Sequence, residues 1–425
     1  MVRMRSRLYG HTDFRRLWAG QTISQLGSQI STLALPLVAV LALHASAFRV
    51  SLLGMFEMLP FLLFALPAGA WVDRVARRPV LIGADAFRAL ALGSIPLAAA
   101  VSHVTFVQLC VVGFVAGTLT VCFDVSYQSY LPALVDREHL VDANAKLELS
   151  NSGSQIAGPG LAGLLVQWLT APYAIAADAV SFVWSALLVG RIERREEIEP
   201  PTEQRNLARE IADGLRYLVT DARWRAMATF VAVFNLGTGI TGPLILVFAV
   251  RRLGLSAGQL GLVFSLGNVG WLVGALVARR AALVLRLGPA LFVAALLGGL
   301  PFFLIPLATP HVAIPLLVAA EAITALSIVV FNINGISLYQ THVPPRMLGR
   351  MNASRRWIVW GIIPLGNVIG GALAATIGLR TTLFVGAGIS TAAAVFLLTK
   401  PILSLATVDG DARAAGDGGV AAPAE

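Results

Sequence analysis

The feature that most constrains this chain is a succession of long apolar runs, each about 20 residues, separated by short polar connections. A helix rises about 1.5 Å per residue, so each run can cross a hydrocarbon core of about 30 Å. Backbone groups inside a bilayer have no water to bind, which requires such runs to be helical. We predict membrane-spanning helices at residues 17–43, 50–72, 80–101, 104–127, 147–169, 173–190, 226–250, 257–278, 287–307, 311–338, 355–377 and 381–400.

Composition and charge agree with an integral membrane protein. Hydrophobic residues make up 57% of the chain, charged residues only 13%, and the mean hydropathy is +0.76, which excludes a water-soluble globular protein. The net charge of +9 comes from arginines that gather on one side of the predicted bilayer, in the N-terminal segment and in the connections near residues 74–78, 191–225, 279–286 and 346–356. By the positive-inside rule both termini are expected in the cytoplasm, and no nucleic-acid partner is needed to explain the charge.

A polar segment and an internal repeat divide the spans six and six. Residues 191–225 interrupt the apolar pattern and are expected to form a cytoplasmic linker that ends in a short amphipathic helix. Tyr127-Gln128-x-x-x-Pro132 after the fourth span recurs as Tyr339-Gln340-x-x-x-Pro344 after the tenth, about half a chain length later. We therefore expect two related six-helix bundles at 1–190 and 226–400, followed by a disordered cytoplasmic tail at 401–425.

A charged turn separates the second and third spans, and four charges within six residues of it cannot enter lipid. The turn resembles the signature loop of the major facilitator superfamily, Gly-x-x-x-Asp-Arg-x-Gly-Arg-Arg/Lys. The matching residues are Gly69, Asp73, Arg74, Arg77 and Arg78, and an alanine stands at position 76 where the pattern has glycine. The resemblance implies an all-α integral membrane fold of twelve helices in two pseudo-symmetric six-helix bundles, which transports by alternating access.

The fifth span carries a second motif, Gly153-x-x-x-x-Gly158-Pro159-Gly160-x-x-Gly163. Small residues allow close helix packing, and Pro159 removes a helical hydrogen bond. The motif resembles the glycine-proline motif that exporters of this superfamily carry in their fifth helix, where it is associated with drug/proton antiport. Ordinary close packing is the alternative, because the eleventh span contains a similar set of one proline and three glycines at 364–371.

Further phrases resemble the branch of the superfamily that contains enterobactin exporters and macrolide efflux proteins. They are His11-x-x-Phe14-Arg15-Arg16-Leu17-Trp18, Asp85-x-x-Arg88, and Phe123-Asp124-x-x-Tyr127-Gln128 before Leu131-Pro132-x-Leu134-Val135. The chain departs from this branch in two ways. The fourth span lacks the arginine of many drug/proton antiporters, and Gly27 in the first span is followed by Ser28 where relatives commonly have an acid.

Ionisable residues within the spans are the candidates for mechanism, because a charge near the bilayer centre costs roughly 2.5–3.5 kcal/mol on insertion scales. Glu321, near the middle of the tenth span, is the leading candidate for a carboxyl group that carries protons, and Glu57 is the second. A static hydrogen-bonded role is the alternative for each. Asp85 and Arg88, three residues apart, are expected to form a structural ion pair, and a role in coupling is the alternative.

The charged turn and its neighbours are expected to act together as a conformational gate on the cytoplasmic side. Asp124 lies close to the same face as Asp85 and Arg88 and is expected to help hold the turn closed. Asp178 falls near the outer end of its span, and we expect it to be solvated. The predicted gate comprises Gly69, Asp73, Arg74, Arg77, Arg78, Asp85, Arg88 and Asp124.

Uncharged amides within the spans suggest the wall of a substrate cavity. Gln21, Gln25 and Gln29 share one helix face, and the second half contributes Asn235, Asn268, Asn332, Asn334 and Asn367. Interhelical hydrogen bonding is the alternative role for these amides. Apolar walls with few charges favour a neutral or weakly charged amphipathic substrate over a nucleotide or sugar phosphate.

The sequence thus predicts a secondary active transporter of the cell membrane that exports a small amphipathic molecule, drug-, antibiotic- or siderophore-like, by proton antiport. An importer or facilitator of a small metabolite and a non-transporting membrane sensor or secretion factor are the alternatives. A membrane enzyme is disfavoured because all six histidines fall at span ends or in loops, and no phosphate-binding loop occurs. We expect no cofactor and no metal. The expected partners are the substrate, protons and the lipid bilayer, and the protein is expected to be a monomer.

Overall fold

The structure is a computed structural model that describes residues 11–72, 74–194, 207–343, 351, 357 and 359–405. Every regular element in these residues is a helix, as predicted. Asp73 of the predicted gate, the middle of the linker and the tail from residue 406 lie outside the described residues.

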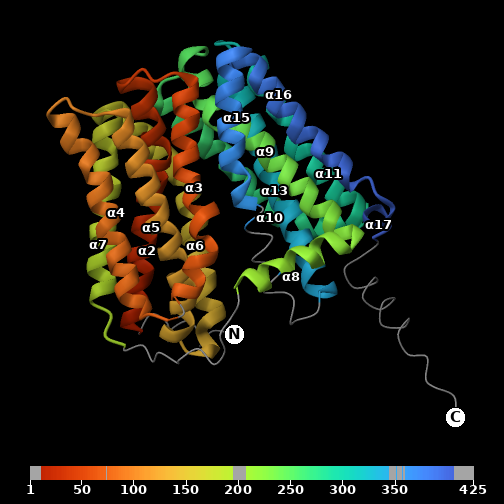
Figure 1. Ribbon diagram of the computed structural model, residues 1–425, viewed down its shortest axis with the longest axis horizontal. Coiled ribbons are helices and arrows are strands. Elements are labelled where there is room, and N and C mark those ends of the chain that lie inside the picture. The colour runs from red at the N-terminus through yellow and green to blue at the C-terminus, as the bar shows by residue number, and fades with distance from the viewer. Residues whose placement is uncertain are drawn as a thin grey trace. The chain divides into compact units, whose positions relative to one another are not determined.

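The first half of the chain forms six long helices, which Figure 1 shows side by side. They are α2 (Thr12–Leu37), α3 (Ala47–Val72), α4 (Arg77–Ala100), α5 (Phe106–Leu134), α6 (Leu140–Leu169) and α7 (Ala171–Gly190). A π-helical turn, η2 (Val38–Ala42), prolongs α2, and a 3₁₀ turn, η3 (Arg137–His139), precedes α6. α7 packs against α2 and α4, α5 packs against α3 and α4, and α6 packs against α2. This order places α2, α4, α5 and α7 around one interior.

The second half begins with α8 (Leu207–Thr220), a short amphipathic helix where the linker was expected to end. Its longer elements are α9 (Ala222–Arg251), α10 (Ala257–Leu285), α11 (Leu287–Gly299), α13 (Ala313–His342), α15 (Ile363–Thr376) and α16 (Leu379–Ala392). Shorter pieces are η4 (Leu300–Phe303), α12 (Leu304–Leu307), η5 (Ala393–Leu397) and α17 (Lys400–Leu403). The ninth predicted span is interrupted, because it passes from α11 through η4 into α12. Pro301 lies in η4 and Pro306 in α12, and neither can donate a helical hydrogen bond.

Within the described residues, eleven helical segments are long and apolar enough to cross a membrane. The remaining predicted span is α6, which is long enough but carries serine, glutamine, glycine and proline along its middle in place of apolar residues. The protein is therefore a multi-pass membrane protein whose twelve predicted spans all correspond to helices.

The described residues form two compact units. The first unit takes those of Met1–Leu207, Gly242–Ser265 and Asn367–Leu379, and the second takes those of Ala208–Thr241, Leu266–Gly366 and Arg380–Glu425. The first unit is held by a core that includes Phe14, Leu81 and Tyr130, and the second by one that includes Trp224 and Phe331. In each unit this core joins the beginnings of some helices to the ends of others.

Candidate substrate and coupling sites

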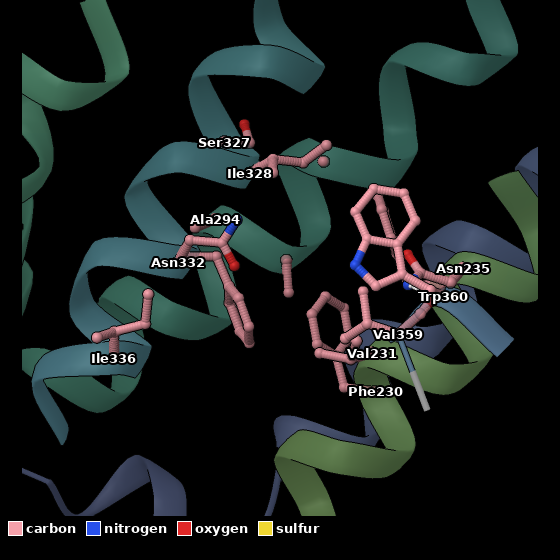
Figure 2. Close-up of a pocket in the computed structure, with 14 residues that line it drawn as sticks. Phe230, Val231, Asn235, Ala294, Ser327, Ile328, Asn332, Ile336, Val359 and Trp360 are labelled. Atoms are coloured by element: carbon pink, nitrogen blue, oxygen red, sulfur yellow. Dashed lines mark hydrogen bonds between the residues drawn. The ribbon is translucent and has the colours of Figure 1, made fainter. Parts of the chain in front are cut away.

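A cavity of about 320 Å³ lies within the second unit, between α9, α11, α13 and residues 359–360. Figure 2 shows Asn332 and Ile336 on one side of it and Trp360, Asn235 and Phe230 on the other. None of the described residues that line this second-unit cavity is charged. Its walls therefore suit an apolar molecule with few hydrogen-bonding groups.

Aromatic contacts and one amide give the second-unit cavity its shape. The Phe230 ring lies 4.7 Å from the Phe331 ring and 5.6 Å from the Phe234 ring, measured between centroids. Asn235 donates from Nδ2 to the Val359 carbonyl oxygen at 2.8 Å, which ties α9 to the chain before α15. Asn332 also lines the cavity. The described lining thus combines aromatic rings with two neutral amides.

The other predicted cavity residues of the second half lie elsewhere. Asn334 is buried and donates from Nδ2 to the carbonyl oxygens of Ala278 and Val330 at 3.1 and 2.9 Å, so it joins α13 to α10. Asn268 is half-buried on α10. Asn367 is 3% exposed and belongs to the first unit, where its amide lies against Gly54 of α3.

The three glutamines of α2 belong to the first unit. Gln21 is buried, whereas Gln25 and Gln29 are half-buried. A Cβ atom at Gly158 would lie 2.4 Å from Cβ of Gln29, so this glycine of the second motif is where α6 approaches α2. The Gln29 stem thus packs against the motif.

The glycine-proline motif packs on two sides within the first unit. A Cβ at Gly163 would lie 2.4 Å from the Ala257 carbonyl oxygen, and Pro159 has its carbonyl oxygen 2.4 Å from the corresponding position on Gly261. The N–H of Gly160 donates to Oγ of Ser265 at 2.8 Å. Gly153 has open space around it. The central glycines are therefore sites of close helix approach to α2 and α10.

A buried charged centre lies between α4, α5 and α7. Asp85 and Arg88 form the predicted ion pair, and their side chains are 0% and 6% exposed. The Arg88 guanidinium lies 4.5 Å above the Phe123 ring and 4.1 Å from the Phe182 ring, and it also donates to Oγ1 of Thr120 at 3.4 Å. Thus α4 presents an arginine to α5, the span that has none of its own.

Asp178 also belongs to this centre, so the prediction that its side chain is solvated is wrong. The residue is 1% exposed, and Oδ1 accepts from Oγ of Ser181 at 3.0 Å. A Cβ at Gly27 would lie 2.6 Å from the same oxygen, so the absent side chain on α2 makes room for the carboxyl of α7. Sequence reasoning missed this residue, although the serines at 181 and 185, one turn apart on α7, marked a polar face.

The two proton-coupling candidates share a mode of packing. A Cβ at Gly113 of α5 would lie 3.0 Å from Cγ of Glu57, and one at Gly267 of α10 would lie 2.4 Å from Cγ of Glu321. Both side chains are half-buried. Neither carboxyl makes a hydrogen bond or an ion pair to any residue that the structure describes. Glu321 does not line the second-unit cavity.

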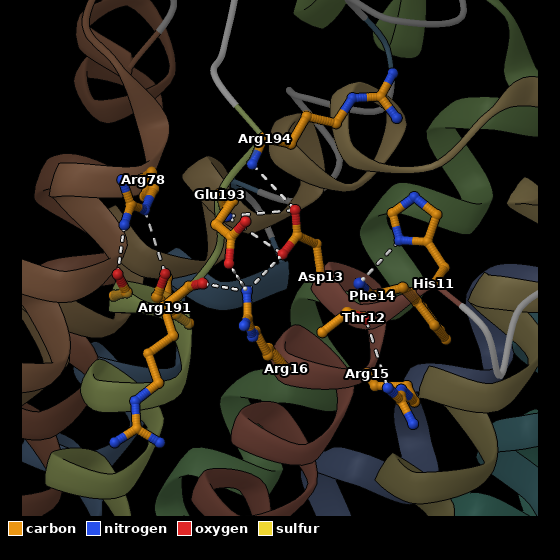
Figure 3. Close-up of polar contacts among 12 residues, drawn as sticks. His11, Thr12, Asp13, Phe14, Arg15, Arg16, Arg78, Arg191, Glu193 and Arg194 are labelled. Atoms are coloured by element: carbon orange, nitrogen blue, oxygen red, sulfur yellow. Dashed lines mark hydrogen bonds and ion pairs between the residues drawn. The ribbon is translucent and has the colours of Figure 1, made fainter.

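Polar groups close one end of the first unit, as Figure 3 shows. Arg78 donates to the carbonyl oxygens of Val189, at 3.3 Å, and of Gly190, and so caps the C-terminus of α7. Asp13 accepts from the backbone N–H groups of Glu193 and Arg194 at 3.2 and 3.0 Å. This end of α7 is thereby tied to the beginnings of α2 and α4.

The remaining gate residues lie around this closed end or deeper in the bundle. Gly69 has open space around it near the end of α3, and Arg74 is exposed in the turn that follows. Arg77 is the first residue of α4 and is half-buried. Asp124 is half-buried on α5. The structure therefore separates the gate set into a turn, a cap on α7 and the deeper Asp85–Arg88 pair.

Comparisons with known proteins agree with this architecture. The family model described as Major Facilitator Superfamily matches residues 17–364, and the chain belongs to that family. It is a transport protein, not an enzyme. Among solved structures, the nucleoside transporter NupG has a TM-score of 0.74 at 14% identity, covering 91% of this chain and 98% of that one. A bacterial homologue of the iron transporter ferroportin has a TM-score of 0.73 at 17% identity, with the same coverage.

Curated relatives place the chain near efflux proteins. The multidrug efflux pump Tap of Mycolicibacterium fortuitum is 28% identical, and the match covers 84% of this chain and 88% of the relative. Macrolide efflux protein A of Streptococcus pyogenes is 23% identical, with 86% and 90% covered. The resemblance to the efflux branch that the sequence phrases indicated is confirmed.

Proposed function

We propose that this protein exports a small, neutral or weakly charged amphipathic molecule, such as a drug or antibiotic, by proton antiport. The observation that carries the proposal is the second-unit cavity, in which phenylalanine and tryptophan rings surround neutral amides and no described lining residue is charged. Such walls bind apolar rings and exclude strongly anionic metabolites, which would require arginine or lysine. The efflux activity named for two relatives supports the direction of transport.

Proton coupling is assigned to Glu321 in the second unit and to Glu57 in the first. Each lies within a helix that spans the membrane, packs on a glycine of a neighbouring helix and makes no polar contact to the described residues. A carboxyl group without an ion-pair partner can bind and release a proton without breaking a salt bridge. The substrate binds one state of the alternating-access cycle and protons favour the other, which couples the two movements.

In the topology proposed with this function, both termini lie in the cytoplasm. The protein is placed in the plasma membrane as a monomer. The arginine-rich connections support this orientation, because short cytoplasmic loops carry excess positive charge. The Asp13, Arg16 and Arg78 cluster would then lie at the cytoplasmic end of the first unit. Neither a cofactor nor a nucleic acid takes part.

Everted membrane vesicles that contain the protein, energised to an acid interior, test this function. Macrolides, lipophilic dyes and siderophores are added in turn while the pH gradient is followed. We expect at least one compound to collapse the gradient only when the protein is present, and Glu321→Gln to abolish the effect. Glu321→Gln with full coupling would remove that residue from the mechanism and leave Glu57→Gln as the next variant.

Movement of a labelled compound without any proton movement would contradict antiport and indicate a facilitator. Binding without flux would indicate a sensor. Asp142→Asn is the matched control, because Asp142 is an exposed carboxyl on α6. It should transport as the wild type does.

A further inference from the structure

We infer that the first unit contains a binding site of its own, for a monovalent amphipathic organic cation. The site is a cavity of about 220 Å³ that is lined from α2, α3, α4, α5 and α7, all within the first unit. Glu57, Arg88 and Asp178 are its charged lining residues among those the structure describes. We call it the first-unit cavity.

The charges around the first-unit cavity do not balance. Arg88 is the single described cation there, and it is already paired with the fully buried Asp85. The Arg88 charge also acts on Asp178, so one cation serves the three carboxyls of Glu57, Asp85 and Asp178, and the cluster carries a formal charge of −2 when all three are ionised. Unpaired charge in a low-dielectric interior is costly, and a bound cation or protons must offset it.

The size and walls of the first-unit cavity select an organic ligand. A volume of about 220 Å³ is many times the roughly 15 Å³ that one water molecule needs. Leu35, Met58, Phe61 and Leu92 supply apolar surface for the substituents of an amine. An inorganic cation requires several oxygen ligands around a point, and the described residues contain no group of three or more metal-ligating side chains.

The anionic groups are also held where a cation would meet them. Ser181 fixes the Asp178 carboxyl through Oγ, and Gly27 leaves space beside it. Glu57 lies across the cavity on α3, where Gly113 and Gly117 of α5 allow the helices to approach. The Arg88 guanidinium lies over the Phe182 ring, and Phe61 is a second aromatic residue of the lining.

This inference rests on the proposed export function in so far as the cation is cargo or competes with protons for the same carboxyls. Binding is therefore tested without flux. Benzyltrimethylammonium is titrated calorimetrically into purified full-length protein in detergent, and benzyl alcohol serves as the uncharged aromatic control. We expect saturable binding of the cation at one site and at least about tenfold weaker binding of the alcohol.

Two isosteric variants locate the binding site. Asp178→Asn and Glu57→Gln are each expected to lower the affinity for benzyltrimethylammonium about tenfold, which corresponds to about 1.4 kcal/mol. Asp142→Asn, an exposed carboxyl on α6, should bind as the wild type does. Ala116→Leu narrows the cavity without changing its charge and should also weaken binding, which covers the case in which Asp178→Asn does not fold.

Unchanged affinity in both carboxyl variants, equal binding of the alcohol, or no binding to the wild type would overturn the inference. Because the vesicle assay with uncharged compounds is independent of this titration, export can persist while the cation site fails. The reverse result, binding without any transport, would refute the proposed function and keep the site.

Discussion

The first and second units each enclose a cavity, and the two cavities differ in what lines them. In the first, the charged residues Glu57, Arg88 and Asp178 share the lining with apolar and hydroxyl side chains. In the second, rings such as Phe331 and Trp360 surround neutral amides, with no charge on the described lining residues. The two halves of the chain share a repeated loop motif, yet the two cavities differ in the chemistry of their linings.

The contrast extends to the ion pairs. Asp85–Arg88 in the first unit is almost completely buried, whereas Asp221–Arg223 in the second unit lies at the start of α9 with both side chains 32% exposed. Buried pairs are costly to break and exposed pairs contribute little. Removal of one partner of the Asp85–Arg88 pair should therefore cost more stability than removal of one partner of the Asp221–Arg223 pair.

The largest effect is expected from Arg88→Ala. Removal of the guanidinium leaves the fully buried Asp85 without its cation, which should destabilise the protein by about 3–5 kcal/mol. Thermal unfolding in detergent measures the change. The double variant Asp85→Asn/Arg88→Gln should recover part of the loss, and an Arg88→Ala protein with an unchanged unfolding temperature would contradict the assignment of a buried pair.

Gly27→Ala should have the next largest effect, because the new Cβ would lie 2.2 Å from Oγ of Ser181 and 2.6 Å from the Asp178 carboxyl. Overpacking of this kind costs about 1–3 kcal/mol, and it should also weaken cation binding to the first unit. Gly153→Ala is the matched control, since nothing lies within 4 Å of its added Cβ. Equal unfolding temperatures for the two variants would argue against close packing of α2 on α7.

Trp360→Ala tests the neutral cavity. The indole lines the second-unit cavity, so its loss should raise the apparent KM for an exported aromatic dye by up to about tenfold, as expected for a lost aromatic contact. Trp168→Ala is the control, because Trp168 is 74% exposed at the end of α6. If Trp360→Ala also weakened cation binding in the first unit, the two cavities would not be independent binding sites.

A smaller effect is expected from Arg78→Gln, which removes the charged cap from the C-terminus of α7. Interactions of a cation with a helix C-terminus contribute about 0.3–1 kcal/mol, and unfolding temperature reports the loss. Arg74→Gln alters an exposed arginine of the same signature turn and should change stability less. If the two substitutions have the same effect, net charge at this end matters more than the cap.

The smallest effect concerns Asp221. Burial alone would raise the pKa of Asp221, but hydrogen bonds from the Arg223 side chain and backbone outweigh burial and hold this pKa below its ordinary value. A lowered pKa means that the ionised group stabilises the fold above about pH 4 and that this contribution disappears as the pH falls through the lowered pKa. At pH 7 the free energy of unfolding of the wild type should exceed that of Asp221→Asn by less than about 1 kcal/mol. Unfolding temperatures measured from pH 7 to pH 3 should show the two proteins converging at the acid end.

Much of the fold follows from local sequence. Apolar runs of membrane-spanning length predict helices because each backbone group must find its hydrogen-bond partner within the same segment. The predicted boundaries erred where polar ends continue a helix, as in α5, which runs to Leu134, and α6, which begins at Leu140. The Asp85–Arg88 pair was also predictable, since residues three apart share a helix face.

The binding chemistry was less predictable, because position along a span does not reveal what a side chain faces. Asp178 was expected to be solvated from its place near a helix end, yet Gly27 and Ser181 enclose it. Asn332 and Asn334 are two residues apart on α13, and only Asn332 reaches the second-unit cavity. Rotation about the helix axis separates them, and that rotation is set by contacts with neighbouring helices.

The sequence by itself determined the membrane location, the number and order of spans and the family, because hydrophobic length and short loop motifs are local properties. Only the tertiary structure decided which charges share a cavity, that α4 presents its arginine to α5, and that the carboxyl of α7 lies against a glycine of α2. These outcomes depend on how closely helices approach, and in a membrane close approach is set by small residues on facing helices far apart in the chain.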